Sequence, residues 1–113
     1  QPDVARNALK AWLEGVAYAL SPRMKPAVIE TITRRLKISN PNLAEQGYQD
    51  LLRATDRKPY PSAEGLNNVQ RLMKLRNPAV ADLKPATLVD ARLIQELDKS
   101  GFIDQLYADY GVK

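Results

Sequence analysis

The stretch that decides the fold is DVARNALKAWLEGVAYAL, residues 3–20. Its apolar residues recur at spacings of three and four, which is typical of one face of a helix. These residues are Ala5, Ala8, Leu9, Trp12, Leu13, Val16 and Leu20. Ser21 and Pro22 follow, and proline cannot continue a helix because it lacks a backbone donor. A helix ending at Leu20 is therefore predicted.

The same spacing predicts further short helices along the chain. Asn40 followed by Pro41, and Ser62 before an apolar run, are typical helix starts. Gly101 can take the left-handed conformation that often ends a helix. The second expected helix covers residues 26–37, the third begins at Asn40 and Pro41, and the fourth covers residues 63–76. Residues 79–89 are expected to hold one turn of helix. A fifth helix runs from Asp90 to Gly101, and a last one carries Phe102, Ile103, Leu106 and Tyr107.

No segment shows the alternation of apolar and polar residues, bounded by hairpin turns, that indicates strands. The sequence therefore predicts an all-α chain of five to six short helices, with residues 1–113 forming a single helical module. Residues 56–61 carry charges and two prolines around Tyr60, so we expect an extended surface connection there.

The composition excludes several classes of protein. The 113 residues are 44% hydrophobic and 27% charged, as expected of a soluble globular segment. No window reaches the roughly 20 apolar residues that a membrane span needs, and the N-terminus lacks signal-peptide features. The absence of cysteine and histidine removes disulfides, the usual zinc ligands and the commonest general base.

The formal charge of +4 could attract an anionic partner or simply keep the protein soluble. The densest basic run is Arg34, Arg35 and Lys37. The tyrosines are not interleaved with it as base-stacking platforms would be, so we expect no nucleic-acid partner.

Three residues are candidates for ligand binding: Trp12, Arg57 and Tyr60. Trp12 could form an aromatic wall, but its place in the helical pattern favours packing in the core. Arg57 and Tyr60 lie with Lys58 on the irregular segment, where cations could meet an anion or a partner protein. Two prolines also explain that segment as a solvated connector, which is the interpretation we favour.

The acidic residues do not predict a metal or catalytic centre. Asp98 and Asp104 flank Gly101 without calcium-loop spacing, and Asp104 is better explained as a first-turn charge of the last helix. Single glutamates are dispersed over the predicted helices without histidine or cysteine companions. We expect no metal, no cofactor and no enzymatic activity.

Three stretches together resemble a known family: KAWLEGVAYA at 10–19, RKPYPSAEGL at 57–66 and NPAVADLKPATLVDARLIQELDKSGFIDQLY at 77–107. Their order and spacing resemble the C-terminal region of the nitrate, sulfonate and taurine type of periplasmic substrate-binding protein, a group related to thiamine-precursor proteins. The resemblance spans nearly the whole chain.

The resemblance implies a two-lobed α/β protein that captures a small anionic or zwitterionic solute and delivers it to an ABC permease. This chain would be its C-terminal helical part, a fragment with a periplasmic location. Its partners would be the remainder of its own protein, the permease and the solute. We also expect the element near Gln1 to continue upstream.

Two alternatives belong to other classes. A free-standing helical module would bind a partner helix in one exposed apolar groove. An excised piece would instead expose a broad apolar face or self-associate to cover it. The third class is an enzyme of thiamine-precursor type, whose substrate contacts would lie outside this chain.

Overall fold

The computed structural model describes residues 2–113, and within that range it contains helices and no strand. The prediction of an all-α chain of five to six helices is confirmed. The α-helices are α1 (Pro2–Leu20), α2 (Lys25–Leu36), α3 (Pro41–Ala54), α4 (Ala63–Met73), α5 (Arg92–Lys99) and α6 (Phe102–Asp109), and the 3-10 helices are η1 (Pro22–Met24), η2 (Pro78–Asp82) and η3 (Pro85–Leu88).

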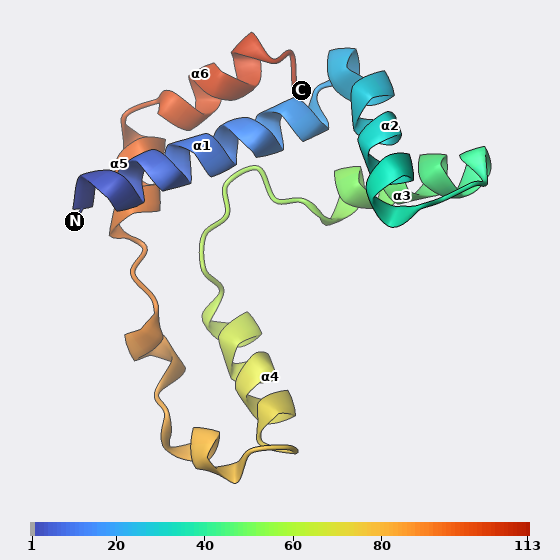
Figure 1. Ribbon diagram of the computed structural model, residues 1–113. Coiled ribbons are helices and arrows are strands. Elements are labelled where there is room, and N and C mark those ends of the chain that lie inside the picture. Colours follow the sequence, from blue (N-terminus) through green and yellow to red (C-terminus); the bar gives the residue numbers. More distant parts are fainter. Residues whose placement is uncertain (1) are drawn as a thin grey trace.

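The core lies where one face of α1 packs against α5 and α6 (Figure 1). Leu13 and Ile103 are fully buried there. The other buried members of this cluster are Ala17, Leu20, Ile94, Leu97 and Tyr107. Buried Ser21 donates from its hydroxyl to the carbonyl oxygen of Tyr110 at 2.7 Å, so the ends of α1 and α6 are held together.

The second packing unit is formed by α2 and α3, which pack against each other. Val28, Ala44 and Tyr48 are its buried residues. The expected helix over residues 26–37 ends one residue early, because Lys37 takes a left-handed conformation at φ 53°. The amide of Ile38 then bonds to the carbonyl of Thr33, which closes the helix end.

The predicted helix starts at Asn40 and Ser62 are confirmed. The Asn40 side chain accepts from the amide of Asn42, and the Ser62 hydroxyl accepts from the amide of Gly65, both at 3.0 Å. Asp90 accepts from the amide of Arg92 at 3.0 Å but lies one residue before the cap position, which Ala91 occupies. Gly101 has φ 78°, as predicted for the turn between α5 and α6.

Residues 62–90, which hold α4, η2 and η3, form an arm that extends away from the core (Figure 1). The side-chain amide of Gln70 donates to the carbonyls of Val80 and Leu83, both at 2.7 Å, and so fixes η2 beside α4. The predicted helix over 63–76 ends at Met73, because the amides of Leu75 and Arg76 bond three residues back in a tighter turn. Residues 79–89 hold most of η2 and all of η3, where the sequence predicts one turn of helix.

The molecule is an open frame, with the arm on one side and the two packing units on the other (Figure 1). Its radius of gyration is 17.2 Å, against about 13 Å for a compact chain of this length. Its accessible surface is 8429 Å², where a folded monomer of this mass exposes about 6,200 Å². About 2,200 Å² more surface is therefore exposed than compact folding leaves.

Candidate functional site

The strongest cluster of charged groups joins the connector, defined as residues 55–61 between α3 and α4, to the α5–α6 turn. The ammonium group of Lys58 lies 2.7 Å from a carboxylate oxygen of Asp98 and 2.9 Å from one of Asp104. Asp98 is near the end of α5, and Asp104 is in the first turn of α6. The left-handed Gly101 between these helices permits the reversal that lets both carboxylates meet one cation.

Two tyrosines strengthen this attachment. The Tyr60 hydroxyl donates to Asp98 at 2.5 Å. The hydroxyl of Tyr107, whose residue is only 5% exposed, donates to the carbonyl oxygen of Arg57 at 2.6 Å. The connector is therefore held to α5 and α6 through three of its residues, by the carbonyl of Arg57, the ammonium group of Lys58 and the hydroxyl of Tyr60.

The contacts shift the acid–base behaviour of the cluster. The hydrogen bond from Lys58, followed by that from Tyr60, lowers the pKa of Asp98 below its ordinary value. The same bond to Asp98 raises the pKa of Lys58, and the bond to the carboxylate raises the pKa of Tyr60. Asp98 thus stays ionised and Lys58 stays charged near neutral pH, an arrangement suited to attachment and unsuited to proton transfer.

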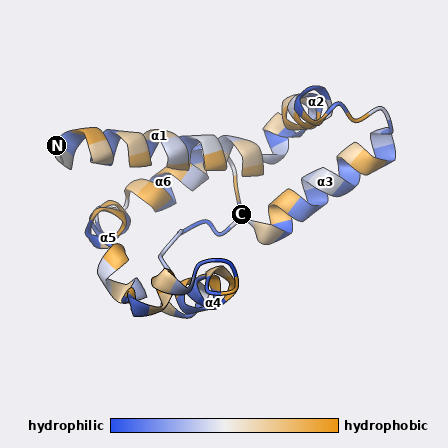
Figure 2. Ribbon diagram, turned by 60° about the horizontal axis from the view of Figure 1, so that its bottom comes forward, coloured by the Kyte–Doolittle hydropathy of each residue, from blue (hydrophilic) through white to orange (hydrophobic). Residues whose placement is uncertain are grey.

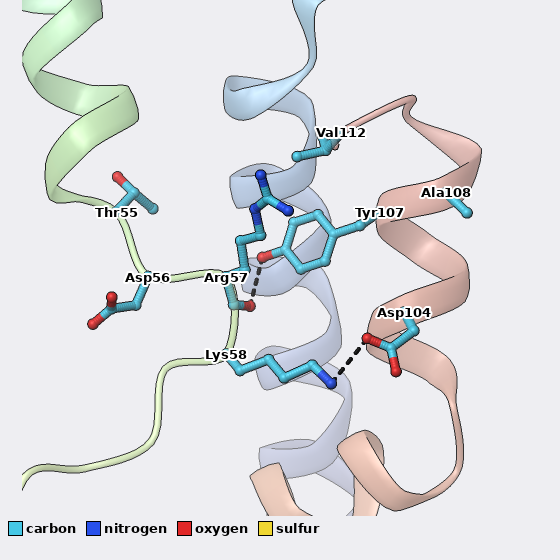
Figure 3. A pocket seen from close by; sticks show the side chains of 8 residues that line it. All are labelled: Thr55, Asp56, Arg57, Lys58, Asp104, Tyr107, Ala108 and Val112. Atoms are coloured by element: carbon cyan, nitrogen blue, oxygen red, sulfur yellow. Dashed lines mark hydrogen bonds and ion pairs between the residues drawn. The ribbon is translucent and has the colours of Figure 1, made fainter.

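A hollow of about 640 Å³ lies beside this cluster (Figure 3). Figure 3 shows the Arg57 side chain beside the Tyr107 ring, with Lys58 reaching Asp104 below it. The lining residues are Thr55, Asp56, Arg57, Lys58, Asp104, Tyr107, Ala108 and Val112. Two cations and two carboxylates balance each other there, so the hollow has no net charge that would select an anion.

Comparison with known proteins gives no family assignment. No family model, curated protein or solved structure matches this chain. Its function therefore has to be argued from its own residues.

Of the three predicted candidates, the structure brings Arg57 and Tyr60 together in the connector. Residues 56–61 are non-helical, as predicted, and Arg57, Lys58 and Tyr60 are exposed. The favoured interpretation as a solvated connector described that exposure but missed the attachments. Asp104 lies in the first turn of α6 as predicted, and in addition it pairs with Lys58.

Trp12 is separate from this cluster, and its predicted burial in the core is wrong. The residue is 51% exposed, whereas its neighbour Leu13 is fully buried. Successive residues of a helix differ by about 100° in direction, so the two side chains cannot share one face. Trp12 is not among the residues that line the hollow of Figure 3.

Residues 2–113 offer neither a metal site nor a membrane span. No group of three or more acidic, histidine or cysteine side chains in that range is placed to hold a metal ion. No helix of the described part is both long and apolar enough to cross a bilayer. The connector cluster and the Trp12 side of α1 remain as the two features that the core does not explain.

Proposed function

We propose that this chain is the C-terminal helical portion of a periplasmic substrate-binding protein of the nitrate, sulfonate and taurine type. The complete protein would capture a small anionic or zwitterionic solute and deliver it to an ABC permease. The proposal rests on the sequence resemblance and on one structural observation, the open frame with its uncovered arm.

The arm supports this proposal because it buries almost none of its apolar residues. Val80 is the one buried residue within 62–90. Val69, Leu72 and Met73 on α4 are 51%, 63% and 51% exposed. Further exposed apolar residues of the arm are Leu75, Leu83 and Leu88. A helix with an exposed apolar stripe gains most of its stability from packing on another surface, and nothing among residues 2–113 supplies that surface.

In Figure 2 the apolar positions of α4 lie among hydrophilic ones, at a distance from the core helices. An excess of about 2,200 Å² over a compact monomer is comparable to what obligate partners bury. We infer that the frame packs around the lobes of a larger protein and holds them. The role of this portion is then structural, and the solute contacts belong to the lobes.

The free-standing interaction module has less support. A single groove would concentrate the exposed apolar residues, whereas they are distributed over several elements. Examples are Val4 on α1, Leu43 on α3 and Leu72 on α4. This distribution fits a surface that encloses a body better than a groove that holds one helix.

The test is a comparison of thermal unfolding between the protein made from its own gene and the isolated chain. A panel of nitrate, taurine and short alkanesulfonates serves as the probe. We expect one of these anions to raise the melting temperature of the full protein, because binding to the native state stabilises it. We expect no rise for the isolated chain. A gene product that consists of this chain alone, or a full protein that none of the panel stabilises, overturns the proposal.

A further inference from the structure

A second hollow shares one wall with the hollow of Figure 3, since Thr55, Arg57 and Val112 line both. Its volume is about 580 Å³, within the range of roughly 300–1,000 Å³ found for small-molecule pockets. The rest of its lining comes from the end of α1, from η1, from the end of α3 and from the segment after α6. Parts of the chain that are distant in sequence therefore form one concave surface.

The turn after α6 forms one side of the second hollow. Gly111 has φ 67°, which reverses the chain, and the amide of Val112 then donates to the carbonyl oxygen of Tyr107 at 2.9 Å. The hydrogen bond from Ser21 to Tyr110 ties the same turn to the end of α1. Figures 1 and 2 both show the C-terminal end of the chain beside the end of α1. This side of the hollow is thus fixed by hydrogen bonds.

Charge distinguishes the two hollows. Two carboxylates balance two cations in the hollow of Figure 3, whereas the second hollow is lined by the cations Arg57 and Lys113 and, within residues 2–113, by no acidic side chain. Of the two carboxylates in the first hollow, Asp104 pairs with Lys58. Figure 3 shows the side chain of the other, Asp56, directed away from that of Arg57. The charge of Arg57 therefore faces the second hollow without a carboxylate beside it.

Arg57 combines a fixed backbone with a free head group. Its carbonyl oxygen accepts from the Tyr107 hydroxyl at 2.6 Å, and the next residue, Lys58, is held by two carboxylates. Its guanidinium group makes no hydrogen bond and no ion pair within residues 2–113. In Figure 3 this group lies beside the Tyr107 ring and extends toward Val112. A cation held in this way needs little ordering when it binds an anion.

The lining next to Arg57 is apolar. Leu20 is 7% exposed, and Leu52 and Val112 are partly buried against the same core cluster. Pro22 adds a further apolar surface at the rim. A pocket with an apolar floor and one positioned cation suits a ligand with an anionic head and an apolar tail. The planar guanidinium group can donate two parallel hydrogen bonds to a carboxylate, which makes a carboxylate the head that matches it best.

We propose that the second hollow binds a carboxylate with an apolar tail, of the medium-chain fatty acid class. Arg57 binds the carboxylate, and Leu20, Leu52 and Val112 contact the tail. The inference does not rest on the proposed transport function, because the transported solute would contact the lobes. Nitrate, taurine and short alkanesulfonates lack a tail of this length, so the thermal test of that function remains separate. Either proposal can fail without the other.

The test is an NMR titration of the chain with octanoate, followed through the backbone amides of Gly111 and Val112. We expect these amides to shift and to saturate. Butanoate should bind at least about tenfold more weakly, because its shorter tail buries less apolar surface. Octanol has the tail without the charge and should also bind at least about tenfold more weakly. Shifts that do not saturate, or equal affinities for octanoate and octanol, overturn the proposal.

Two variants separate Arg57 from the general positive charge of the chain. Arg57→Met should weaken octanoate binding at least about tenfold and leave octanol binding unchanged, since only the charged head loses its partner. Arg53→Met is the matched control, because Arg53 is an exposed cation of α3 that pairs with Asp50 and does not line the hollow. It should bind octanoate like the native chain. Equal losses in the two variants, or octanoate shifts confined to Asp56 and Asp104 of the first hollow, contradict the inference.

Discussion

The ammonium group of Lys58 lies 2.7 Å from Asp98, although the whole arm separates these two residues in the sequence. The chain leaves the core at the connector, runs out through α4 and returns through η2 and η3 to α5. The Lys58–Asp98 pair therefore joins the outgoing segment to the helix that receives the returning one. Because the arm buries so little of itself, this closure determines where its base lies.

Replacing Lys58 with methionine should loosen the base of the arm. The apolar stem remains, but neither Asp98 nor Asp104 can then bind a cation. Since the Lys58 bond is the largest cause of the lowered pKa of Asp98, that pKa should rise toward its ordinary value in Lys58→Met. An NMR titration of the Asp98 carboxyl measures this. Lys99→Met, which removes a charge nearby that makes no ion pair within residues 2–113, is the matched control and should leave the pKa unchanged.

Acid should weaken the fold partly through Asp98. Because its pKa is lower in the folded chain than in the unfolded one, the stabilisation it provides is present above the unfolded value of about 4 and is lost as the pH falls through the folded value. The Asp98 side chain is 22% exposed, so water screens part of this stabilisation.

The check is urea unfolding at about pH 6 and about pH 3, for the native chain and for Asp98→Asn. Asp98→Asn should be less stable at the higher pH and should lose less stability on acidification. If Asp98→Asn lost as much stability on acidification as the native chain, ionised Asp98 would contribute nothing to the stability of the fold. The bond from Arg92 lowers the pKa of Asp90 to about 2, so these two residues form a second acid-sensitive pair. The native chain and Asp98→Asn both contain this pair.

The hydroxyl of Tyr107 should be worth about 1 kcal/mol to the fold, the usual net value of one hydrogen bond. Its bond to the Arg57 carbonyl is the least exposed contact of the connector. Tyr107→Phe keeps the ring in the core and removes only this bond. Tyr18→Phe is the control, because the Tyr18 ring packs against Tyr110 at its edge while its hydroxyl makes no hydrogen bond within residues 2–113. Equal unfolding midpoints for the two variants would contradict the assigned role of Tyr107.

The features that could be predicted from the sequence are those encoded within a few residues. The caps at Asn40 and Ser62 and the left-handed Gly101 each depend on one side chain or on its absence. The helical periods depend on neighbours three and four positions apart. For this reason the number and order of the α-helices were predicted correctly, and the errors at their ends were small.

The burial of Trp12 could not be predicted in the same way, because α1 has apolar residues on opposite sides. Periodicity reveals that a face exists, but it does not reveal which of two faces meets α5 and α6. The connector cluster could not be predicted either, for another reason. Nothing local to Lys58 indicates Asp98 or Asp104, since their meeting depends on how the arm returns to the core.

Glycine conformation offers a final test of the packing at the end of α6. Gly111 has φ 67°, and a Cβ there would lie 2.7 Å from a guanidinium nitrogen of Arg23. Arg23 can swing aside, so the backbone strain dominates, and Gly111→Ala should lower the free energy of unfolding by about 1–2 kcal/mol. Gly101→Ala, with φ 78° and open space, should lose a similar amount.

Gly47→Ala should change the free energy of unfolding in the opposite direction. Gly47 lies inside α3, and a Cβ there would make an ordinary contact of 3.9 Å with Ile32. Alanine is the better helix former by about 1 kcal/mol, so this variant should be more stable than the native chain. Urea unfolding of the three variants side by side gives the comparison. If Gly111→Ala matched Gly47→Ala in stability, the left-handed turn that brings Val112 back to the core would have no role in holding α6.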